Sequence, residues 1–325
     1  MLKRIIVCVL LIAALAGLAN YRQLQGSVSA FFTGHDLSDK AVTSRDKVKL
    51  WVTADYGSMT IWSGEIETAP GQDLLDLMKK HMQVGTGYGG GFVKTINGFP
   101  AQDSSPASKD WFLYIDGILS DKGAGEAVPA NGQVVWWDFH GWDGTTFVPA
   151  SIGAYPRPLS SEIIIAAPAG EDSQKAADQV AKIVGGKTRN KTKLIPLTKG
   201  WTPESYKCPV IVIGAWPELS KIPAVTALFQ RSVESGIFCG FKNGDLLAYD
   251  EQGRVAREFG AGCGCLVASG SGLGDTSPVW IISSTDRQGM ESVIRLLREH
   301  PEKVSRRFGL VAAGSEILAL PAKRK

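Results

Sequence analysis

Apolar and polar residues alternate along the first half of the chain in a pattern typical of strands. Strand-like segments with apolar residues at alternate positions or in short runs, bounded by turn residues, occur at residues 48–52, 59–67, 92–96, 111–115 and 134–139. One helix is expected from Pro70, because Leu74, Leu77 and Met78 form an apolar face. Several strands around one helix predict an α+β, grasp-like (ubiquitin-like) domain over residues 47–148.

Beyond residue 160 the pattern changes to buried strands that alternate with amphipathic helices. Strands are expected at residues 162–167, 210–213, 246–249, 265–268, 279–283, 308–312 and 317–320, and helices at 172–184, 218–235 and 286–299. This order predicts an α/β domain with a largely parallel sheet over residues 161–325. Residues 149–160, which contain three prolines, are expected to form a Pro-rich linker between the two domains.

The N-terminus has the pattern of a segment that directs export. Lys3 and Arg4 precede an uninterrupted apolar stretch over residues 5–19. Residues 1–22 are therefore expected to form either a cleaved signal peptide or an uncleaved signal-anchor helix in the membrane. Residues 23–46 are polar, of mixed charge and without periodicity, which predicts a linker. We expect an extracytoplasmic protein, secreted or anchored to the outer side of the cell membrane.

Composition and charge narrow the class of protein. The 325 residues are 44% hydrophobic and 21% charged, which allows packed cores, and the net charge is +3. No dense basic run lies outside the extreme ends, so nucleic acid is not an expected partner. The cysteines beyond the N-terminal segment are Cys208, Cys239, Cys263 and Cys265. They are expected either to form disulfides in an oxidising compartment or to serve as small buried apolar residues.

No sequence motif requires catalysis. The chain has no Gly-x-Ser-x-Gly nucleophile elbow and no Cys and His pair at a recognisable spacing. Asp138, His140 and Asp143 cluster at the end of an expected strand, where a polar strand end is favoured over a metal site. We therefore expect a protein without a catalytic site, a metal or a required cofactor.

Aromatic residues are concentrated in the first domain. A glycine-dense loop is expected over residues 85–91, and Tyr88 and Phe92 flank its three consecutive glycines. Trp111, Trp137 and Trp142 lie on later strands or at their ends. Trp137 also follows another tryptophan directly, so the two rings point to opposite faces of the sheet. Exposed rings beside a glycine loop would suit a large, flat, partly apolar ligand. The alternative is that these rings build a core and a domain interface.

The motifs of this region resemble a known family. The run from Gly85 to Gly98, the segment Trp111-Phe-Leu-Tyr-Ile-Asp-Gly117 and the segment Asn131-Gly-Gln-Val-Val-Trp136 resemble the DUF4430 domain. That domain is similar to the C-terminal β-domain of transcobalamin and intrinsic factor, and the resemblance covers residues 48–142. It implies ligand contacts on the glycine loop and nearby strand ends, which here are Tyr88, Gly89, Gly90, Phe92, His140 and Trp142.

These observations together predict an extracytoplasmic, non-catalytic binding protein. The resemblance makes cobalamin or another corrinoid the expected ligand and implies a role in its uptake, with a membrane transporter as a further partner. One alternative is a cell-surface module that binds protein or glycan and no small molecule. Another is an extracellular hydrolase whose catalytic residues the sequence does not identify.

Overall fold

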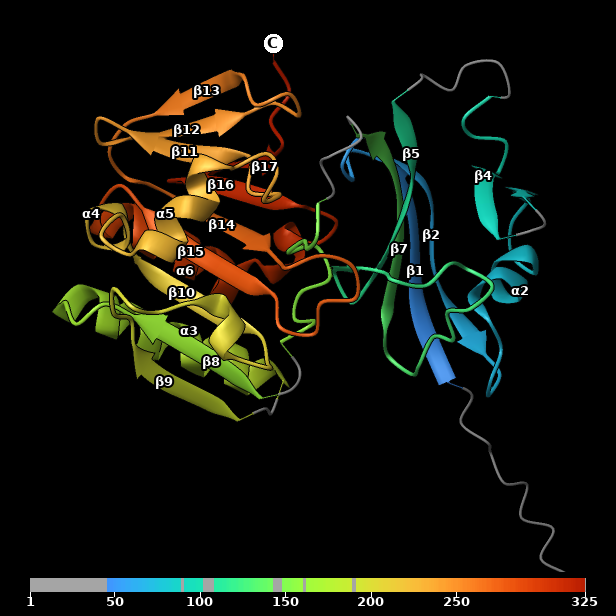
Figure 1. Ribbon diagram of the computed structural model, residues 1–325, viewed down its shortest axis with the longest axis horizontal. Helices are drawn as coiled ribbons and strands as arrows, with labels where there is room; N and C mark the ends of the chain where they lie inside the picture. The colour runs from blue at the N-terminus through green and yellow to red at the C-terminus, as the bar shows by residue number, and fades with distance from the viewer. Residues whose placement is uncertain are drawn as a thin grey trace, which may run out of the picture. The chain divides into compact units, whose positions relative to one another are not determined.

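The structure is a computed structural model that describes residues 46–88, 91–101, 108–142, 148–159, 162–188 and 191–324. All of these residues belong to one compact unit, residues 45–325. The described chain is a mixed α and β protein, mostly strands in several sheets with few helices (Figure 1). None of its helices combines the length and the hydropathy that a membrane crossing requires. The predicted export segment 1–22, and the predicted linker except Asp46, lie outside the described residues.

The first sheet has the strand order β2-β1-β7-β5-β6. Its strands are β1 (Asp46–Ala54), β2 (Met59–Thr68), β5 (Lys109–Ile115), β6 (Ile118–Leu119) and β7 (Val134–Gly141). The central pair β1 and β7 is parallel, and the other neighbouring pairs are antiparallel. Val48, Leu50 and Val52 are fully buried on one face of β1, as their alternation predicts, in a core with Leu74 and Leu77 of helix α2 (Leu74–Lys79).

The predicted start of this helix at Pro70 is wrong. Helix α2 begins at Leu74 because the Asp73 carboxylate accepts a hydrogen bond from the backbone N–H of Asp76, at 2.9 Å. A carboxylate at this position satisfies one of the N–H groups that a helix start leaves without an intrahelical partner. The N-cap residue therefore defines the start of the helix, three residues after the proline.

Part of the predicted glycine loop is a strand. β3 (Val84–Gly87) pairs antiparallel with β4 (Phe92–Ile96) in a two-stranded sheet. A Cβ added at Gly85 would meet Oγ1 of Thr95 at 2.3 Å. A glycine at this position allows the two strands to approach closely, which its usual association with loops does not predict.

The larger sheet of the later half has the order β17-β16-β14-β15-β10-β8-β9. Its strands are β8 (Ile163–Ala167), β9 (Thr192–Pro196), β10 (Val210–Ala215), β14 (Cys263–Ser269), β15 (Val279–Ser284), β16 (Gly309–Ala313) and β17 (Glu316–Leu320). Strands β9, β8, β10 and β15 are parallel, whereas β14, β16 and β17 pair antiparallel. Among the described residues the sheet is therefore mixed rather than largely parallel, because β14 follows a small antiparallel sheet instead of a helical crossover.

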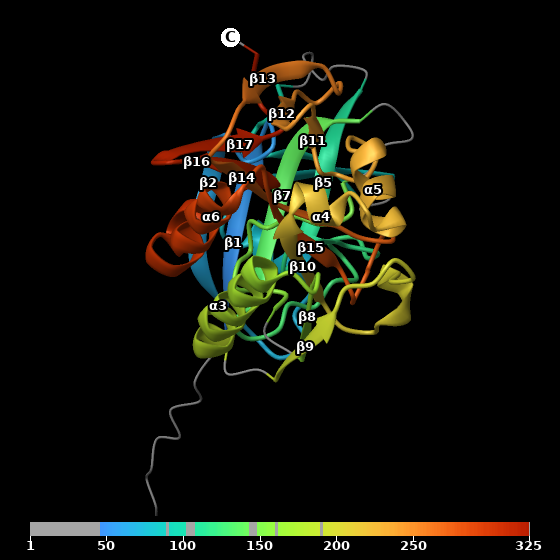
Figure 2. The same ribbon diagram turned by 90° about the vertical axis from the view of Figure 1, so that its left-hand side faces the viewer.

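Helices cover both faces of this sheet. On one face, α3 (Glu171–Thr188) and α6 (Arg287–Glu299) share a core with Trp280 and Ile282 of β15. On the other face, α5 (Pro223–Gln230) shares a core with Val279 and Ile281 of the same strand (Figure 2). The burial of alternate residues on opposite faces explains why this strand is an uninterrupted apolar run.

The predicted helix over residues 218–235 is two shorter helices, α4 (Trp216–Leu219) and α5. Pro223 cannot donate a backbone hydrogen bond, and Ile222 before it is extended, so the first helix ends and a new one begins at the proline. After α5 comes an antiparallel sheet of β11 (Cys239–Lys242), β12 (Asp245–Tyr249) and β13 (Val255–Phe259). Of these three strands, the sequence predicted only β12.

The four cysteines in the described chain are free thiols. Cys239, Cys263 and Cys265 are buried, and Cys208 is half-buried. Burial raises the pKa of the Cys239 thiol well above its ordinary value, and the neighbouring thiol of Cys265 raises it further. Three of the cysteines thus occupy the position of small apolar core residues, which was one of the two expectations.

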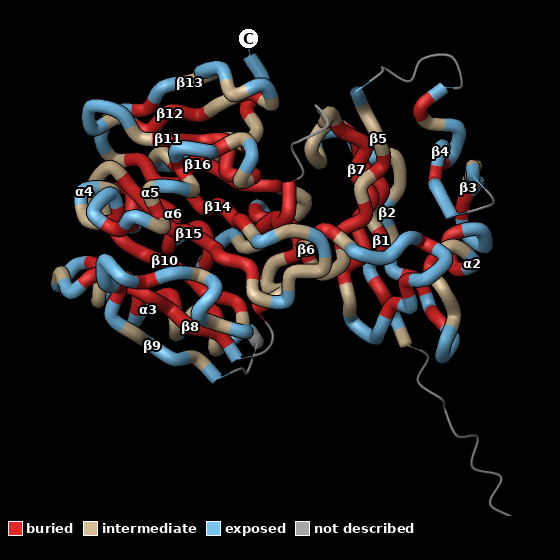
Figure 3. Tube along the Cα trace, viewed as in Figure 1, coloured by how far each residue is buried: buried red, intermediate tan, exposed pale blue. Residues whose placement is uncertain are grey.

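Residues 149–160, predicted as a Pro-rich linker, pack against other parts of the chain over the part that the structure describes. Ile152 and Leu159 are fully buried, and the backbone N–H of Ser151 donates to the carbonyl of Gly117 at 2.8 Å. Buried segments run through both halves of the chain (Figure 3). One core cluster includes Tyr114 and Trp136 of the first sheet together with Phe308 of the later half. Apolar side chains in the stretch explain its burial, whereas the division into two domains there stays a prediction.

Candidate ligand-binding surfaces

The predicted binding residues do not come together in one site. Gly89 and Gly90 lie outside the described residues. Tyr88 and Phe92 lie beside each other at the β3–β4 hairpin. The remaining residues lie in the core or at the end of β7, namely Trp111, Trp137, His140 and Trp142.

The hairpin presents an exposed aromatic surface, which we call the aromatic tip and define as Tyr88, Phe92 and Lys94. The Tyr88 side chain is 88% exposed and that of Phe92 39%. Their ring centroids are 5.9 Å apart with planes at 77°, and the Lys94 ammonium lies 5.4 Å from the centre of the Tyr88 ring. An edge-to-face pair with a cation over one ring is a favourable arrangement that leaves ring surface free. Lys94 was missed in the sequence, although its position two residues after Phe92 places it on the same face of β4.

Trp111 and Trp137 are core residues, which corrects the expectation that they contribute to a ligand surface. They are 6% and 5% exposed, and their ring centroids are 6.5 Å apart on the face of the sheet that carries α2. Trp136 points to the opposite face and is buried against Phe308, at 4.8 Å between ring centroids. Because both faces of β7 are covered, the adjacency of Trp136 and Trp137 does not leave either ring exposed.

A buried polar cluster lies at the end of β7. The Asp138 carboxylate accepts hydrogen bonds from the backbone N–H groups of Tyr56 and Gly57, at 3.0 and 2.8 Å, and from the Thr53 hydroxyl. Nδ1 of His140 lies 2.9 Å from the same carboxylate. A fully buried carboxylate is tolerated when donors surround it in this way, so the cluster is first of all a structural one.

His140 is closed off from solvent by aromatic rings. Its imidazole stacks between Tyr56 and Phe112, with centroids 4.4 and 4.3 Å away, and is 2% exposed. Nearby, burial raises the pKa of the Tyr114 phenol well above its ordinary value, and the phenol donates to the carbonyl of Val148 at 3.0 Å. His140 therefore cannot touch a ligand on the surface in this arrangement.

Trp142 and Asp143, which the sequence placed near His140, do not form a binding site with it among the described residues. Trp142 is half-buried, and its backbone N–H donates to the carbonyl of Ser108 at 2.8 Å. Asp143, which the sequence grouped with Asp138 and His140, lies outside the described residues. Among the residues that are described, no three His, Cys, Asp or Glu side chains are placed to hold a metal ion.

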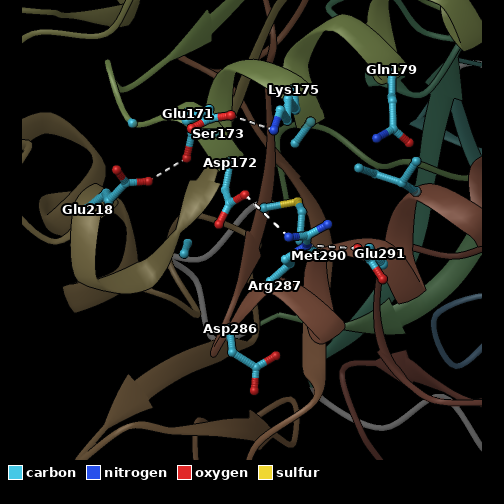
Figure 4. A pocket seen from close by; sticks show the side chains of 14 residues that line it. Glu171, Asp172, Ser173, Lys175, Gln179, Glu218, Asp286, Arg287, Met290 and Glu291 are labelled. Atoms are coloured by element: carbon cyan, nitrogen blue, oxygen red, sulfur yellow. Dashed lines mark hydrogen bonds and ion pairs between the residues drawn. The ribbon is translucent and has the colours of Figure 1, made fainter.

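A cavity of about 360 Å³ lies at the carboxyl edge of the parallel strands in the later half. It is bounded by the beginnings of α3 and α6 and by Ala215 at the end of β10 (Figure 4). Charged side chains surround it: Glu171 pairs with Lys175, and Arg287 lies between Asp172 and Glu291. The Ser173 hydroxyl donates to the Glu218 carboxylate across the start of α3.

This cavity was not predicted from the sequence. Apart from Glu218, its charged residues occur in two short groups, 170–179 and 286–294, each directly after a predicted strand. In open α/β sheets, ligands bind outside the carboxyl ends of the strands. Charged residues directly after predicted strands therefore could have indicated a ligand site. They did not show that residues more than 100 positions apart would meet.

A second cavity, of about 250 Å³, lies near the amino end of β15 and is lined in part by Tyr206, Leu228 and Val279. The carboxylate of Asp275 at its edge accepts hydrogen bonds from the backbone N–H groups of Ser271 and Ser277. None of the predicted binding residues that the structure describes lines either cavity.

Comparison with protein families gives one match. Residues 71–141 match the sequence model of the family described as "Domain of unknown function (DUF4430)". The chain contains a DUF4430 domain. The match confirms the predicted resemblance to DUF4430 over residues 71–141, from just before α2 to the end of β7. For residues 48–70, and for the similarity to transcobalamin and intrinsic factor, the resemblance stays a prediction. Strands β1 and β2 precede it, but β1 pairs with β7 and so extends the same sheet as the DUF4430 domain. No curated protein matches the chain.

Proposed function

We propose that this chain is a non-catalytic binding protein that meets its ligand at the aromatic tip of the DUF4430 domain. The observation that carries the proposal is the Tyr88 ring, 88% exposed beside the Phe92 ring. Large exposed rings cost free energy in water, and a ligand that covers them recovers roughly 25 cal/mol for each Å² of apolar surface buried. An aromatic pair at a hairpin edge is suited to a flat, partly apolar partner.

The ligand that we propose is a corrinoid such as cobalamin. The support is the resemblance of this domain to the β-domain of transcobalamin and intrinsic factor, together with the flat apolar face of a corrin ring. Pockets for drug-sized ligands have volumes of roughly 300–1,000 Å³, and a corrinoid is larger than such ligands. The cavities of about 360 and 250 Å³ are too small to enclose it, so it would lie on the open face of the aromatic tip.

Replacement of Tyr88 by alanine tests this proposal directly. Loss of one ring from the contact should weaken corrinoid binding by about 2 kcal/mol, or about 30-fold in Kd. The measurement is calorimetric titration of the full-length protein with cobalamin and with cobinamide. Val255→Ala is the matched control, because Val255 is also an exposed large apolar side chain (49%) but lies on β13 in the other half.

Two results would count against the proposal. If neither corrinoid gives a binding heat with the unmodified protein, the ligand is wrong. If a corrinoid binds equally well to the Tyr88→Ala and Val255→Ala variants, the aromatic tip is not the site.

The second candidate is a cell-surface module that binds protein or glycan. It is favoured by the openness of the aromatic tip, since neither cavity is lined by Tyr88 or Phe92. In this case the full-length protein would give no corrinoid heat. It would bind a glycan array or a surface protein in a manner that Tyr88→Ala abolishes and Val255→Ala does not.

The proposal includes a grasp-type fold for the first sheet and a location outside the cytoplasm. The order β2-β1-β7-β5-β6, with a parallel central pair and α2 packed on one face, supports the grasp assignment. The location outside the cytoplasm is supported by Lys3 and Arg4 before the apolar stretch over residues 5–19. If the protein serves corrinoid uptake, the partner that we propose is a membrane transporter that receives the corrinoid.

The location has its own test. After expression in an exporting host, mass spectrometry should find the protein outside the cytoplasm, either shortened near residue 19 or intact in the membrane fraction. A full-length protein recovered only from the cytoplasm would contradict it.

A further inference from the structure

The second cavity, of about 250 Å³, lies on the face of the larger sheet that α5 covers. Two of its lining residues are Ser269 at the end of β14 and Val279, its register partner at the start of β15. Directly opposite residues of an antiparallel pair share a face, and Val279 belongs to the core on the α5 side of the sheet. The Ser269 side chain therefore points to this face and into the cavity, where Leu228 of α5 and Tyr206 supply apolar walls.

The Ser269 hydroxyl is the feature that indicates a ligand. The residue is 2% exposed, and no described residue forms a hydrogen bond with its Oγ. The Oγ atoms of Ser283 and Ser284 also lack partners, but the protein encloses them completely and neither residue lines this cavity. The Ser269 hydroxyl differs from both because it faces open space. Buried hydroxyls normally have a partner, so this one is expected to bond to a group that enters the cavity.

A carboxylate lies beside this hydroxyl in a lining without a cation. Oδ2 of Asp275 accepts a hydrogen bond from the backbone N–H of Ser271, at 2.7 Å, two residues after Ser269. Its Oδ1 accepts from the backbone N–H and the hydroxyl of Ser277, at 2.8 and 3.2 Å. These bonds hold the carboxylate at the end of β14, where Ser269 lies. A carboxylate has about four acceptor positions, so Asp275 can accept a further donor.

The chemistry of the lining selects one kind of head group. The charged residues of the lining are Asp275 and the exposed Glu204, and it contains no Lys, Arg or His, so an anion is disfavoured. A metal ion is disfavoured because no three His, Cys, Asp or Glu side chains in the described part of the chain are placed to hold one. A purely apolar molecule would leave the Ser269 hydroxyl and the Asp275 carboxylate without a partner. A primary ammonium group carries a positive charge and three donors, so it can bond to both at once.

The rest of the lining suits an apolar body of limited size. Tyr206, Leu228 and Val279 offer a ring and two aliphatic side chains, against which another ring packs favourably. The volume of about 250 Å³ lies just below the range for drug-sized ligands, roughly 300–1,000 Å³, so a body of one ring fits. We propose that this cavity binds a small primary amine with one apolar ring, its ammonium group held by Asp275 and Ser269 and its ring by the three apolar residues.

The test compares probes that differ in one group at a time, by calorimetric titration of the full-length protein. Phenethylamine, phenethyl alcohol and phenylacetate share a ring and differ in the head group, whereas methylamine has the ammonium group without the ring. Phenethylamine should bind, and phenylacetate should give no heat, because the lining offers no cation to a carboxylate. Phenethyl alcohol should bind about 10-fold more weakly, since it lacks the charge-assisted bond. Methylamine should bind at least about 10-fold more weakly, since it leaves the apolar walls uncovered.

Two variants remove the proposed polar contacts. Asp275→Asn should weaken phenethylamine binding about 10-fold and Ser269→Ala about 5-fold, as loss of a charged and of a neutral hydrogen bond typically does. Ser283→Ala is the matched control for Ser269→Ala, because it removes a buried hydroxyl from the same face of the same sheet, outside the cavity. Asp245→Asn is the control for Asp275→Asn, because Asp245 is also half-buried but lies on β12. Both controls should leave the affinity unchanged.

Three outcomes would overturn the proposal. One is the absence of a phenethylamine heat, and another is equal binding of phenethylamine and phenylacetate. The third is a loss of affinity in Ser269→Ala no larger than that in Ser283→Ala, with circular dichroism showing both variants folded. The corrinoid proposal is tested separately, since neither Tyr88 nor Phe92 lines this cavity.

Discussion

Replacement of Asp138 by alanine is expected to lower the free energy of unfolding by about 3–5 kcal/mol, because each buried donor that loses its acceptor costs about 1–3 kcal/mol. The change leaves the partly buried backbone N–H groups of Tyr56 and Gly57 and the fully buried Thr53 hydroxyl without their shared acceptor. It also removes the partner of His140 Nδ1. Urea unfolding of the full-length protein, followed by tryptophan fluorescence, measures the loss.

Two further variants make this result specific. Asp138→Asn keeps an acceptor oxygen of similar shape and should cost less than alanine. Asp121→Ala removes a carboxylate from an exposed position and should change stability by less than about 0.5 kcal/mol. An Asp138→Ala loss no larger than that of Asp121→Ala would show that the buried cluster is not a stabilising feature.

The second large effect is expected from Gly57→Ala, at about 3 kcal/mol of lost stability. Part of the loss comes from the left-handed backbone of Gly57 (φ +79°), which costs an alanine about 1 kcal/mol. The rest comes from packing, because the added Cβ would meet the backbone oxygen of Arg306 at 2.1 Å and a ring carbon of Trp136 at 3.1 Å. A backbone atom cannot move aside cheaply, so the first sheet must shift relative to the segment before β16.

Gly71→Ala isolates the packing contribution. Gly71 has nearly the same φ, +74°, but nothing lies within 4 Å of an added Cβ. In Gly71→Ala the free energy of unfolding, measured by urea unfolding, should therefore fall by the backbone cost alone, about 1 kcal/mol. Equal losses in the two glycine variants would contradict the close contact between Gly57 and Arg306.

Elements whose buried residues follow one period were predictable from the sequence. The alternation of Val48, Leu50 and Val52 gave β1, and the amphipathic stretch from Asp286 gave α6, with Asp286 as its N-cap. Elements that depend on contacts with distant segments were not predictable. The strand at Gly85 exists because Thr95 leaves space for a glycine alone, and the antiparallel half of the larger sheet depends on where β14 enters it.

The candidate sites divide in the same way. The Tyr88 and Phe92 pair could be identified, because aromatic residues beside glycines in a short hairpin have little else to pack against. The burial of Trp111, Trp137 and His140 could not be predicted, because the residue type does not tell whether another part of the protein or solvent covers the ring. The cavity between α3 and α6 could not be identified either, since six of its seven charged residues come from two segments that are more than 100 residues apart.

The sequence by itself determined the periodicity of many strands and helices, the DUF4430 resemblance and the pairing of Tyr88 with Phe92 around the glycines, because these features depend on residues that are close along the chain. The tertiary structure alone decided which rings are covered and which charged side chains meet around a cavity. The physical reason is that burial and charge compensation are set by neighbours in space, which the fold brings together from distant parts of the chain.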